Sequence, residues 1–235
     1  MVNDLDLMSI HVRALFTHSP ASRLLSINEP DNAATPAPRL FLGRTRVGNI
    51  WKFRADLPED LVQELDSLCL DEPELNAEFK EAPRHLERYA QLLEEHSPVK
   101  MVSSGPAYRF PKKIVPSRRP LALRVNDAER LQDGFEELVV ELPAWQPFVA
   151  LMEGSRAVSV CRSVRITPEA HEAGVETLPD FRGLGYARDA VAEWAQRVWA
   201  LDAIPLYSTS WENTASQAVA RKLDLECYGT DFHIT

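Results

Sequence analysis

The part of the chain best suited to bind an anion is the two-glycine run RGLGYA at residues 182–187. It follows an expected strand over 171–178 and opens an expected helix over 186–201. The first N–H groups of a helix have no partner within the helix, and the helix dipole adds positive charge there. Glycine carries no Cβ, so the backbone of such a turn can come close to a phosphate. The run therefore predicts a site for phosphate oxygens.

Two common phosphate loops do not fit this run. The dinucleotide fingerprint G-x-G-x-x-G fails because Arg188 stands where the third glycine belongs. A P-loop is excluded because the chain has no G-x-x-x-x-G-K-[ST] run. The pattern that fits is R-x-x-G-x-A, which resembles the pyrophosphate-binding motif of the GNAT superfamily of N-acetyltransferases. The preceding residues 179–181, PDF, and the run WENTAS at 211–216 also resemble that family.

The resemblance covers about residues 121–235 and implies a GNAT-like acyltransferase fold, an α/β fold with a mixed sheet, that binds acetyl-CoA. In this family the amides of the glycine turn hold the pyrophosphate, and the strand before it bonds the pantetheine arm through its main chain. An asparagine before the last helix often contacts the same arm. The matching residues here are Val175, Glu176, Thr177, Arg182, Gly183, Leu184, Gly185, Tyr186, Ala187, Arg188, Asn213 and Ser216.

Each of these matches also has a purely structural interpretation. The glycine turn is suited to connect a strand to a packed helix without any ligand. Asn213 precedes an expected helix over 214–223, and asparagine is a favoured N-cap residue, so capping alone accounts for it. Ser216 is either a ligand contact or a tolerated helix residue. The capping and cofactor interpretations of Asn213 are compatible, and both stay open.

Acyl transfer to an amine requires a base or a proton path for the amine, and a proton donor for the departing thiolate. We expect Glu172 on the central strand to be the base, because burial raises the pKa of a carboxyl group. Strand alternation places Glu172 and His171 on opposite faces. Many GNAT enzymes take the donor from a tyrosine seven residues after the asparagine, but Ala220 stands there. Tyr207, Tyr228 and a water molecule are the open alternatives, among which we name Tyr228 as the candidate.

Composition limits the class of protein. The net charge of −9 and the pI of about 5.2 argue against a nucleic-acid-binding surface, which would be basic. The three scattered cysteines have no metal-ligand or disulfide spacing, so no metal is expected. No signal peptide or membrane-spanning run is visible, so we expect a cytoplasmic protein with no membrane partner.

Periodicity divides the chain into two expected domains, an N-terminal α+β domain over 1–110 and the GNAT-like catalytic domain over 121–235. The first holds a helix over 5–16, a hairpin over 39–55, and helices at 58–70 and 83–96. The five prolines between residues 98 and 120 predict a connection without regular structure. In the second we expect a strand at 121–125, a helix at 127–138, a hairpin over 148–166, a strand at 204–208 and a β stretch over 225–234.

We therefore expect an N-acetyltransferase that passes an acetyl group from acetyl-CoA to a primary amine by direct attack in a ternary complex. The acceptor is expected to be a small molecule or a peptide, and the oligomeric state is open. One alternative is a non-catalytic acyl-CoA-binding regulatory module, which Ala220 favours. The other is a structural protein in which the glycine turn is only a connection.

Overall fold

The computed structural model describes residues 2–31, 34–76 and 78–235. Their helices are α1 (Asp4–Leu15), α2 (Glu59–Leu70), α3 (Leu86–His96), α4 (Tyr186–Trp199) and α5 (Thr214–Lys222), with 3-10 helices η1 (Val125–Leu131), η2 (Glu136–Val139) and η3 (Pro179–Phe181). Strands β1 (Phe16–His18) and β2 (Leu24–Ile27) form a small hairpin of their own. The strands of the large sheet are β3 (Leu40–Thr45), β4 (Gly48–Phe53), β5 (Val102–Arg109), β6 (Leu121–Ala122), β7 (Phe148–Glu153), β8 (Arg156–Ile166), β9 (Ala170–Thr177), β10 (Ile204–Ser208) and β11 (Glu226–Ile234).

The large sheet has nine strands in the order β4-β3-β11-β5-β10-β9-β8-β7-β6. Among the described strands of this sheet, only β9 and β10 pair in parallel, and every other pair of neighbours is antiparallel. Helices on both sides of a mixed sheet confirm the α/β fold class that the sequence predicts. The expected helix in 5–16, the hairpins in 39–55 and 148–166, and the helices in 58–70, 83–96, 186–201 and 214–223 are all present.

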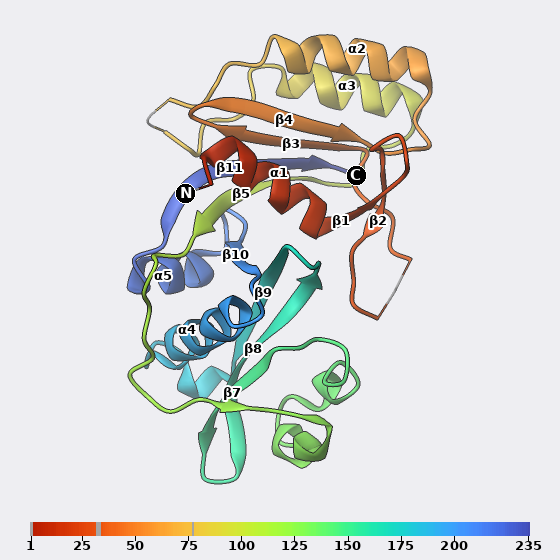
Figure 1. Ribbon diagram of the computed structural model, residues 1–235. Helices are drawn as coiled ribbons and strands as arrows, with labels where there is room; N and C mark the ends of the chain where they lie inside the picture. The colour runs from red at the N-terminus through yellow and green to blue at the C-terminus, as the bar shows by residue number, and fades with distance from the viewer. Residues whose placement is uncertain (1, 32–33, 77) are drawn as a thin grey trace.

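Alternation along the strands assigns one set of helices to each face of the sheet. Phe41 packs with α1, whereas its neighbours Leu40 and Leu42 pack with α2 and α3. In the same way Leu206 lies on the α1 face, and Tyr207 lies with α4 in the largest core. Figure 1 shows α2 and α3 over β3 and β4, with α1 on the opposite side of these strands. The face of the sheet that α1 covers is therefore not the face that α4 covers.

The prediction of an irregular connection is wrong for residues 102–109, which form β5 between β10 and β11. Proline is tolerated there because of where the neighbouring strand ends. The carbonyl of Pro106 accepts from the Thr209 N–H at 3.3 Å, and β10 ends one residue earlier, at Ser208. In an antiparallel strand the N and the carbonyl of one residue face the same neighbouring strand. The N–H that Pro106 lacks would therefore point past the end of β10 and not toward β11, so no hydrogen bond of the sheet is lost.

The expected helix at 127–138 is also wrong, because the segment forms two short 3-10 helices. Gly134 stands between them with a φ of +114°, a value that cannot continue a right-handed helix.

The position of β5 in the sheet bears on the expected division into two domains. This strand comes from the expected N-terminal domain but lies between two strands of the expected catalytic domain. One sheet runs through both, and the division into two domains stays a prediction.

The parallel strands β9 and β10 diverge after three residue pairs. They pair from Ala170 opposite Ile204 to Glu172 opposite Leu206. Beyond this point β10 continues to Ser208 along β5, and β9 continues to Thr177 along β8. The sequence leads us to expect a bulge near Gly174, and the extra residue is on the partner strand, between Ser163 and Arg165. A Cβ at Gly174 would lie 2.2 Å from Val164 Cγ1, so glycine leaves room for the bulged valine.

Candidate functional site

The fork between β9 and β10 opens into a cavity of about 690 Å³. Its walls are the end of β9, the turn into α4, one side of α5 along its length, and Gly134 and Phe135 between η1 and η2. The predicted residues that line it are Val175, Glu176, Thr177, Arg182, Gly183, Gly185, Tyr186, Ala187, Arg188, Asn213 and Ser216. Of the expected cofactor residues, Leu184 alone does not line the cavity, and its side chain is exposed. The structure thus brings together two sequence motifs that are about thirty residues apart in the chain.

The glycine turn presents its main-chain amides without internal partners. Gly183 and Gly185 have φ values of +77° and +89°, which glycine adopts without a steric penalty. Among the hydrogen bonds within the described ranges, none has the N–H of a residue from 183 to 188 as its donor. A Cβ on Gly183 would meet no atom within 4 Å, so the space beside the turn is open. Free donors at a helix N-terminus next to an open cavity are suited to phosphate oxygens.

A buried carboxylate fixes the conformation of this turn. Asp189, fully buried in the first turn of α4, accepts from the Ser117 N–H, from Arg118 Nη1 and from Arg188 Nη1 at 2.7–2.8 Å. The guanidinium of Arg118 lies 4.4 Å from the ring centre of Tyr186 and donates to the Leu184 carbonyl at 3.0 Å. Burial alone would raise the pKa of Asp189, but these donors hold it below its ordinary value. The Asp189 carboxylate is therefore charged and ties the 117–118 loop to the turn.

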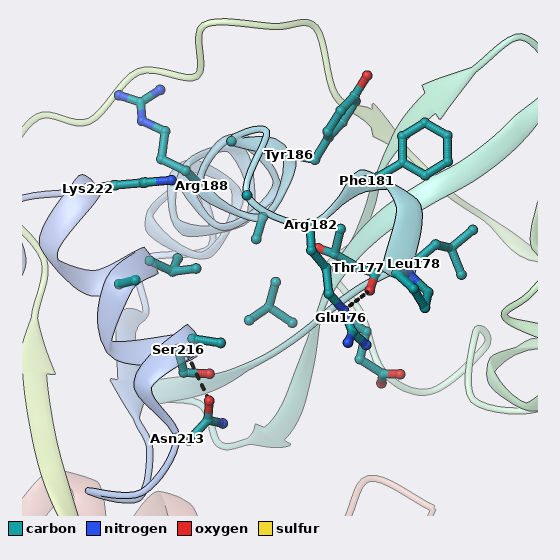
Figure 2. A pocket seen from close by; sticks show the side chains of 18 of the residues that line it. Glu176, Thr177, Leu178, Phe181, Arg182, Tyr186, Arg188, Asn213, Ser216 and Lys222 are labelled. Carbon is teal, nitrogen blue, oxygen red and sulfur yellow. Dashed lines mark hydrogen bonds between the residues drawn. The ribbon is translucent and has the colours of Figure 1, made fainter.

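The exposed edge of β9 can supply main-chain hydrogen bonds to an extended ligand. The Leu178 N–H donates to the Val158 carbonyl on β8, so alternation turns the main-chain groups of Val175 and Thr177 away from β8. That side is the one that β10 leaves open. Arg182 Nε donates to the Thr177 carbonyl at 3.1 Å, as Figure 2 shows. The main-chain groups of Glu176 face β8 by the same alternation, and its carboxylate pairs with Arg162 on that strand at 2.7 Å.

Asn213 caps α5 and also faces the cavity. Its Oδ1 accepts from the Ser216 N–H at 3.0 Å, the dashed contact between the two residues in Figure 2. The capping interpretation is thus observed directly. Lys222 at the other end of α5 lies beside Arg188 at the same wall of the cavity. Lysine and arginine side chains here add positive charge near the free amides.

Variants of Asn213 separate capping from ligand contact. Asn213→Ala should lower the free energy of unfolding by about 1 kcal/mol, whereas Asn213→Ser, which keeps a cap, should stay within a few tenths. We expect Asn213→Ser to bind acetyl-CoA about threefold to tenfold more weakly, the effect of one lost neutral hydrogen bond. Urea unfolding and titration calorimetry on the same samples measure both. Undiminished binding by the serine variant would leave capping as the residue's only role.

Glu172 lies at the closed end of the fork, on the α1 face. It precedes Val175, the first lining residue of β9, by three positions, or about 10 Å along a strand. Its Oε1 accepts from the Ser208 N–H at 2.6 Å and from the Ser208 hydroxyl at 2.9 Å. Burial raises the pKa of Glu172, and the charge of His11 and the Ser208 bonds only partly offset this. His171 points to the other face, where its Nδ1 lies 2.9 Å from Ser163 Oγ.

Tyr228 also lies on the α1 face, outside the cavity lining. It is the extra residue of a bulge in β11, between Cys227 and Gly229, and its hydroxyl is buried without a hydrogen-bond partner among the described residues. Burial, with the charges of Glu172 and Asp231, raises its pKa well above the ordinary range, so the phenol keeps its proton. Tyr207, the other tyrosine considered, donates to the Ser216 carbonyl at 3.2 Å on the opposite face.

Sequence reasoning missed the residues that surround Glu172. His11 on α1 and Asp231 on β11 are both buried beside it. His11 falls on the apolar stripe of the N-terminal helix, and a histidine on such a stripe was the one feature of the sequence that could have indicated these residues.

No membrane-spanning helix is present in the described ranges, since none is both long and apolar enough. Within those ranges, no group of three or more His, Cys, Asp or Glu side chains is arranged so that it could hold a metal ion.

Comparisons with known proteins agree with this geometry. Residues 148–230 match the family model "GNAT acetyltransferase". A GCN5-related N-acetyltransferase from Kribbella flavida has a similar structure, with a TM-score of 0.52, 16% identity, and coverage of 97% of this chain and 93% of that one. An N-acetyltransferase-like protein of the same kind from Streptococcus suis has a TM-score of 0.49 and 15% identity over 98% of this chain and 100% of that one.

A GNAT-family structure from Novosphingobium aromaticivorans is 15% identical, with a TM-score of 0.46 over 58% of this chain, which spans 65% of that protein's length. No curated protein matches the chain. The Kribbella protein supports the fold over nearly the whole length, and the family model covers the fork, the glycine turn and α5. Residues 148–230 are therefore similar to a GNAT acetyltransferase domain, and the fold of the chain is similar to that of the Kribbella protein.

Proposed function

We propose that this protein is an N-acetyltransferase that uses acetyl-CoA to acetylate a primary amine of a small molecule or a peptide. The observation that carries the proposal is the turn at 183–188, whose amides have no partner among the described residues and which lies beside a 690 Å³ cavity where β9 has diverged from β10. Such a cavity can receive a long, thin ligand that carries a diphosphate at one end. The family match over 148–230 supports the same assignment.

The residues present fit acetyl-CoA in three ways. The turn amides and the positive end of α4 suit the diphosphate. Arg182, Arg188 and Lys222 around the same cavity complement its charge. The main-chain groups of Val175 and Thr177, on the open edge of β9, suit the amides of the pantetheine arm. When bound, acetyl-CoA supplies an acetyl group activated as a thioester.

The chemistry needs a base for the amine and a proton donor for the thiolate. Glu172 is the proposed base, because it is buried at the fork with a raised pKa and an Oε2 that accepts no hydrogen bond from the described residues. Tyr228 is the proposed donor, because its unpartnered hydroxyl keeps its proton on the same face. Ala220 cannot serve, since it is a fully buried methyl in the core under α5.

Binding and turnover are tested separately. Titration calorimetry should detect acetyl-CoA and coenzyme A, but not acetyl-pantetheine, which lacks the diphosphate. Release of free thiol from acetyl-CoA is then followed across a panel of primary amines, with secondary alcohols as a negative set. Equal binding of acetyl-pantetheine would count against the turn as the anion site. Binding without thiol release for any amine would overturn the transferase and leave a module that only binds acyl-CoA.

A further inference from the structure

Four titratable side chains form a continuous row beneath α1. Glu172 Oε2 lies 3.7 Å from His11 Nδ1, and His11 Nε2 lies 3.0 Å from Asp231 Oδ2. The other carboxylate oxygen, Asp231 Oδ1, lies 3.8 Å from His233 Nε2. The row runs from β9 through α1 to β11, and so starts at the fork described above. His11 comes from the N-terminal end of the chain, and Asp231 and His233 come from its C-terminal end.

The side chains of the row are least exposed at His11 and become more exposed from there toward His233. The side chains of Glu172 and His11 are 5% and 1% exposed, whereas those of Asp231 and His233 are 10% and 23% exposed. Glu172 Oε2, His11 Nδ1 and His233 Nε2 are buried atoms without a hydrogen-bond partner among the described residues. Burial of unpaired polar atoms is costly, so their concentration in one row calls for a function.

The protonation preferences along the row differ. Burial alone would lower the pKa of His11, but the hydrogen bond to Asp231 and the charges of Glu172 and Asp231 raise it overall. Burial lowers the pKa of His233, so this ring is neutral and able to accept a proton. The other charged or titratable groups that face the row are Tyr228 on β11, Arg109 on β5 and Arg165 on β8.

We propose that His11, Asp231 and His233 form a relay that carries the proton taken up by Glu172 from the fork to solvent. The inference rests on the proposed acetyltransferase function and assigns the N-terminal helix a part in it. Among the four residues, only Glu172 meets the amine. His11 acts through Glu172, and the gaps of 3.7 and 3.8 Å on the two sides of the His11–Asp231 hydrogen bond are the places where side chains must approach for transfer.

The proton balance of the reaction requires such an exit. A primary ammonium must lose one proton before its nitrogen can attack the thioester carbonyl carbon. The C–N bond then forms and the C–S bond breaks. Tyr228 gives its proton to the departing thiolate, and the second proton of the nitrogen replaces the one that Tyr228 has lost. The first proton therefore leaves as net acid, and Glu172 must lose it before each new turnover. The relay returns this carboxylate to its charged form while the fork stays closed to water.

The test compares His11→Gln with the unaltered protein and with Arg13→Gln. Glutamine can still donate to Asp231 but cannot carry a proton. Arg13 pairs with Glu169 at 2.7 Å and also joins α1 to the start of β9, but this ion pair is half exposed and outside the row. We expect kcat/KM for thiol release to fall about tenfold to hundredfold in His11→Gln, within the range of proton-transfer effects, and to stay unchanged in Arg13→Gln.

The pH profile adds a readout that a packing defect would not produce. The charge of His11 lowers the pKa of Glu172, so His11→Gln should move the acidic limb of kcat/KM to higher pH. If that variant fails to fold, His233→Gln at the exposed end keeps the relay testable. Its reduced rate should rise with imidazole concentration, whereas that of the unaltered protein should not.

Unchanged rates and an unmoved acidic limb in both histidine variants would overturn the relay while leaving the transferase intact. A lack of thiol release by the unaltered protein would instead overturn the proposed function, and the relay with it. The two failures are therefore distinguished before any variant is compared.

Discussion

Gly183→Asp should remove most of the affinity for acetyl-CoA, whereas Gly154→Asp should leave it intact. The two glycines are a matched pair, since both have a positive φ, +77° and +61°, and a Cβ at either would meet nothing within 4 Å. Each substitution imposes a similar backbone strain, of order 1–3 kcal/mol. Only Gly183 lies in the turn whose free amides face the cavity.

The expected loss follows from charge. Two like unit charges about 4 Å apart repel by about 4 kcal/mol at an effective dielectric constant of about 20. With allowance for solvent, affinity should fall by about a hundredfold, or ~2.7 kcal/mol. Titration calorimetry with acetyl-CoA measures the change, and thermal unfolding shows whether strain is matched in the two variants. Equal affinity in both would mean that the diphosphate does not lie at this turn.

The residues that line the cavity were predictable as a group because their signals are local. A helix N-terminus supplies free amides wherever it occurs, and Gly183 and Gly185 mark the turn that makes these amides accessible. The strand before the turn and the helix after it follow from their own periodicities. Nearly all the residues expected to hold the cofactor line one cavity for this reason.

The placement of β5 was not predictable from its own residues. Pro106 is typical of a connection, and only the end of β10 at Ser208 makes it acceptable in the sheet. Gly105 follows the same logic, since a Cβ there would lie 1.6 Å from the Thr209 carbonyl oxygen. Both residues are suited to their contacts with Thr209, which is about a hundred positions away in the chain. Packing across the whole chain decides which strands become neighbours, so the local propensity of a segment does not predict its place in the sheet.

The surroundings of Glu172, the proposed base, show the same limit. His11 and Asp231 are hydrogen-bonded at 3.0 Å although 220 residues separate them in the chain. In the sequence, His11 is one position of an amphipathic helix and Asp231 one position of a terminal strand. Glu172 could be named as a candidate because a carboxyl group on a central strand is unusual by itself. His11 and Asp231 could be recognised as its neighbours only from the folded structure, in which α1 lies over the fork.

Glu172→Gln should lower kcat/KM by about a hundredfold to ten-thousandfold without weakening the binding of acetyl-CoA. Glutamine keeps an acceptor for the Ser208 N–H and hydroxyl, so the geometry of the fork is retained. It cannot take a proton from the amine, so the acidic limb of the pH profile should disappear. Glu169→Gln, which removes an exposed carboxylate just before β9, should have the activity of the unaltered protein.

Stability gives an independent check on the same carboxyl group. Its folded-state pKa is raised above the unfolded value, so its contribution to stability is present below about pH 4.5 and is lost as the pH rises through the folded-state pKa. Glutamine has no such dependence, so the free energy of unfolding of Glu172→Gln, relative to the unaltered protein, should increase from pH 4.5 toward neutral pH. Urea unfolding across this range measures the difference. A constant difference would mean that Glu172 titrates as it does in the unfolded chain, and a carboxyl group of that kind would lack the raised proton affinity that deprotonation of the amine requires.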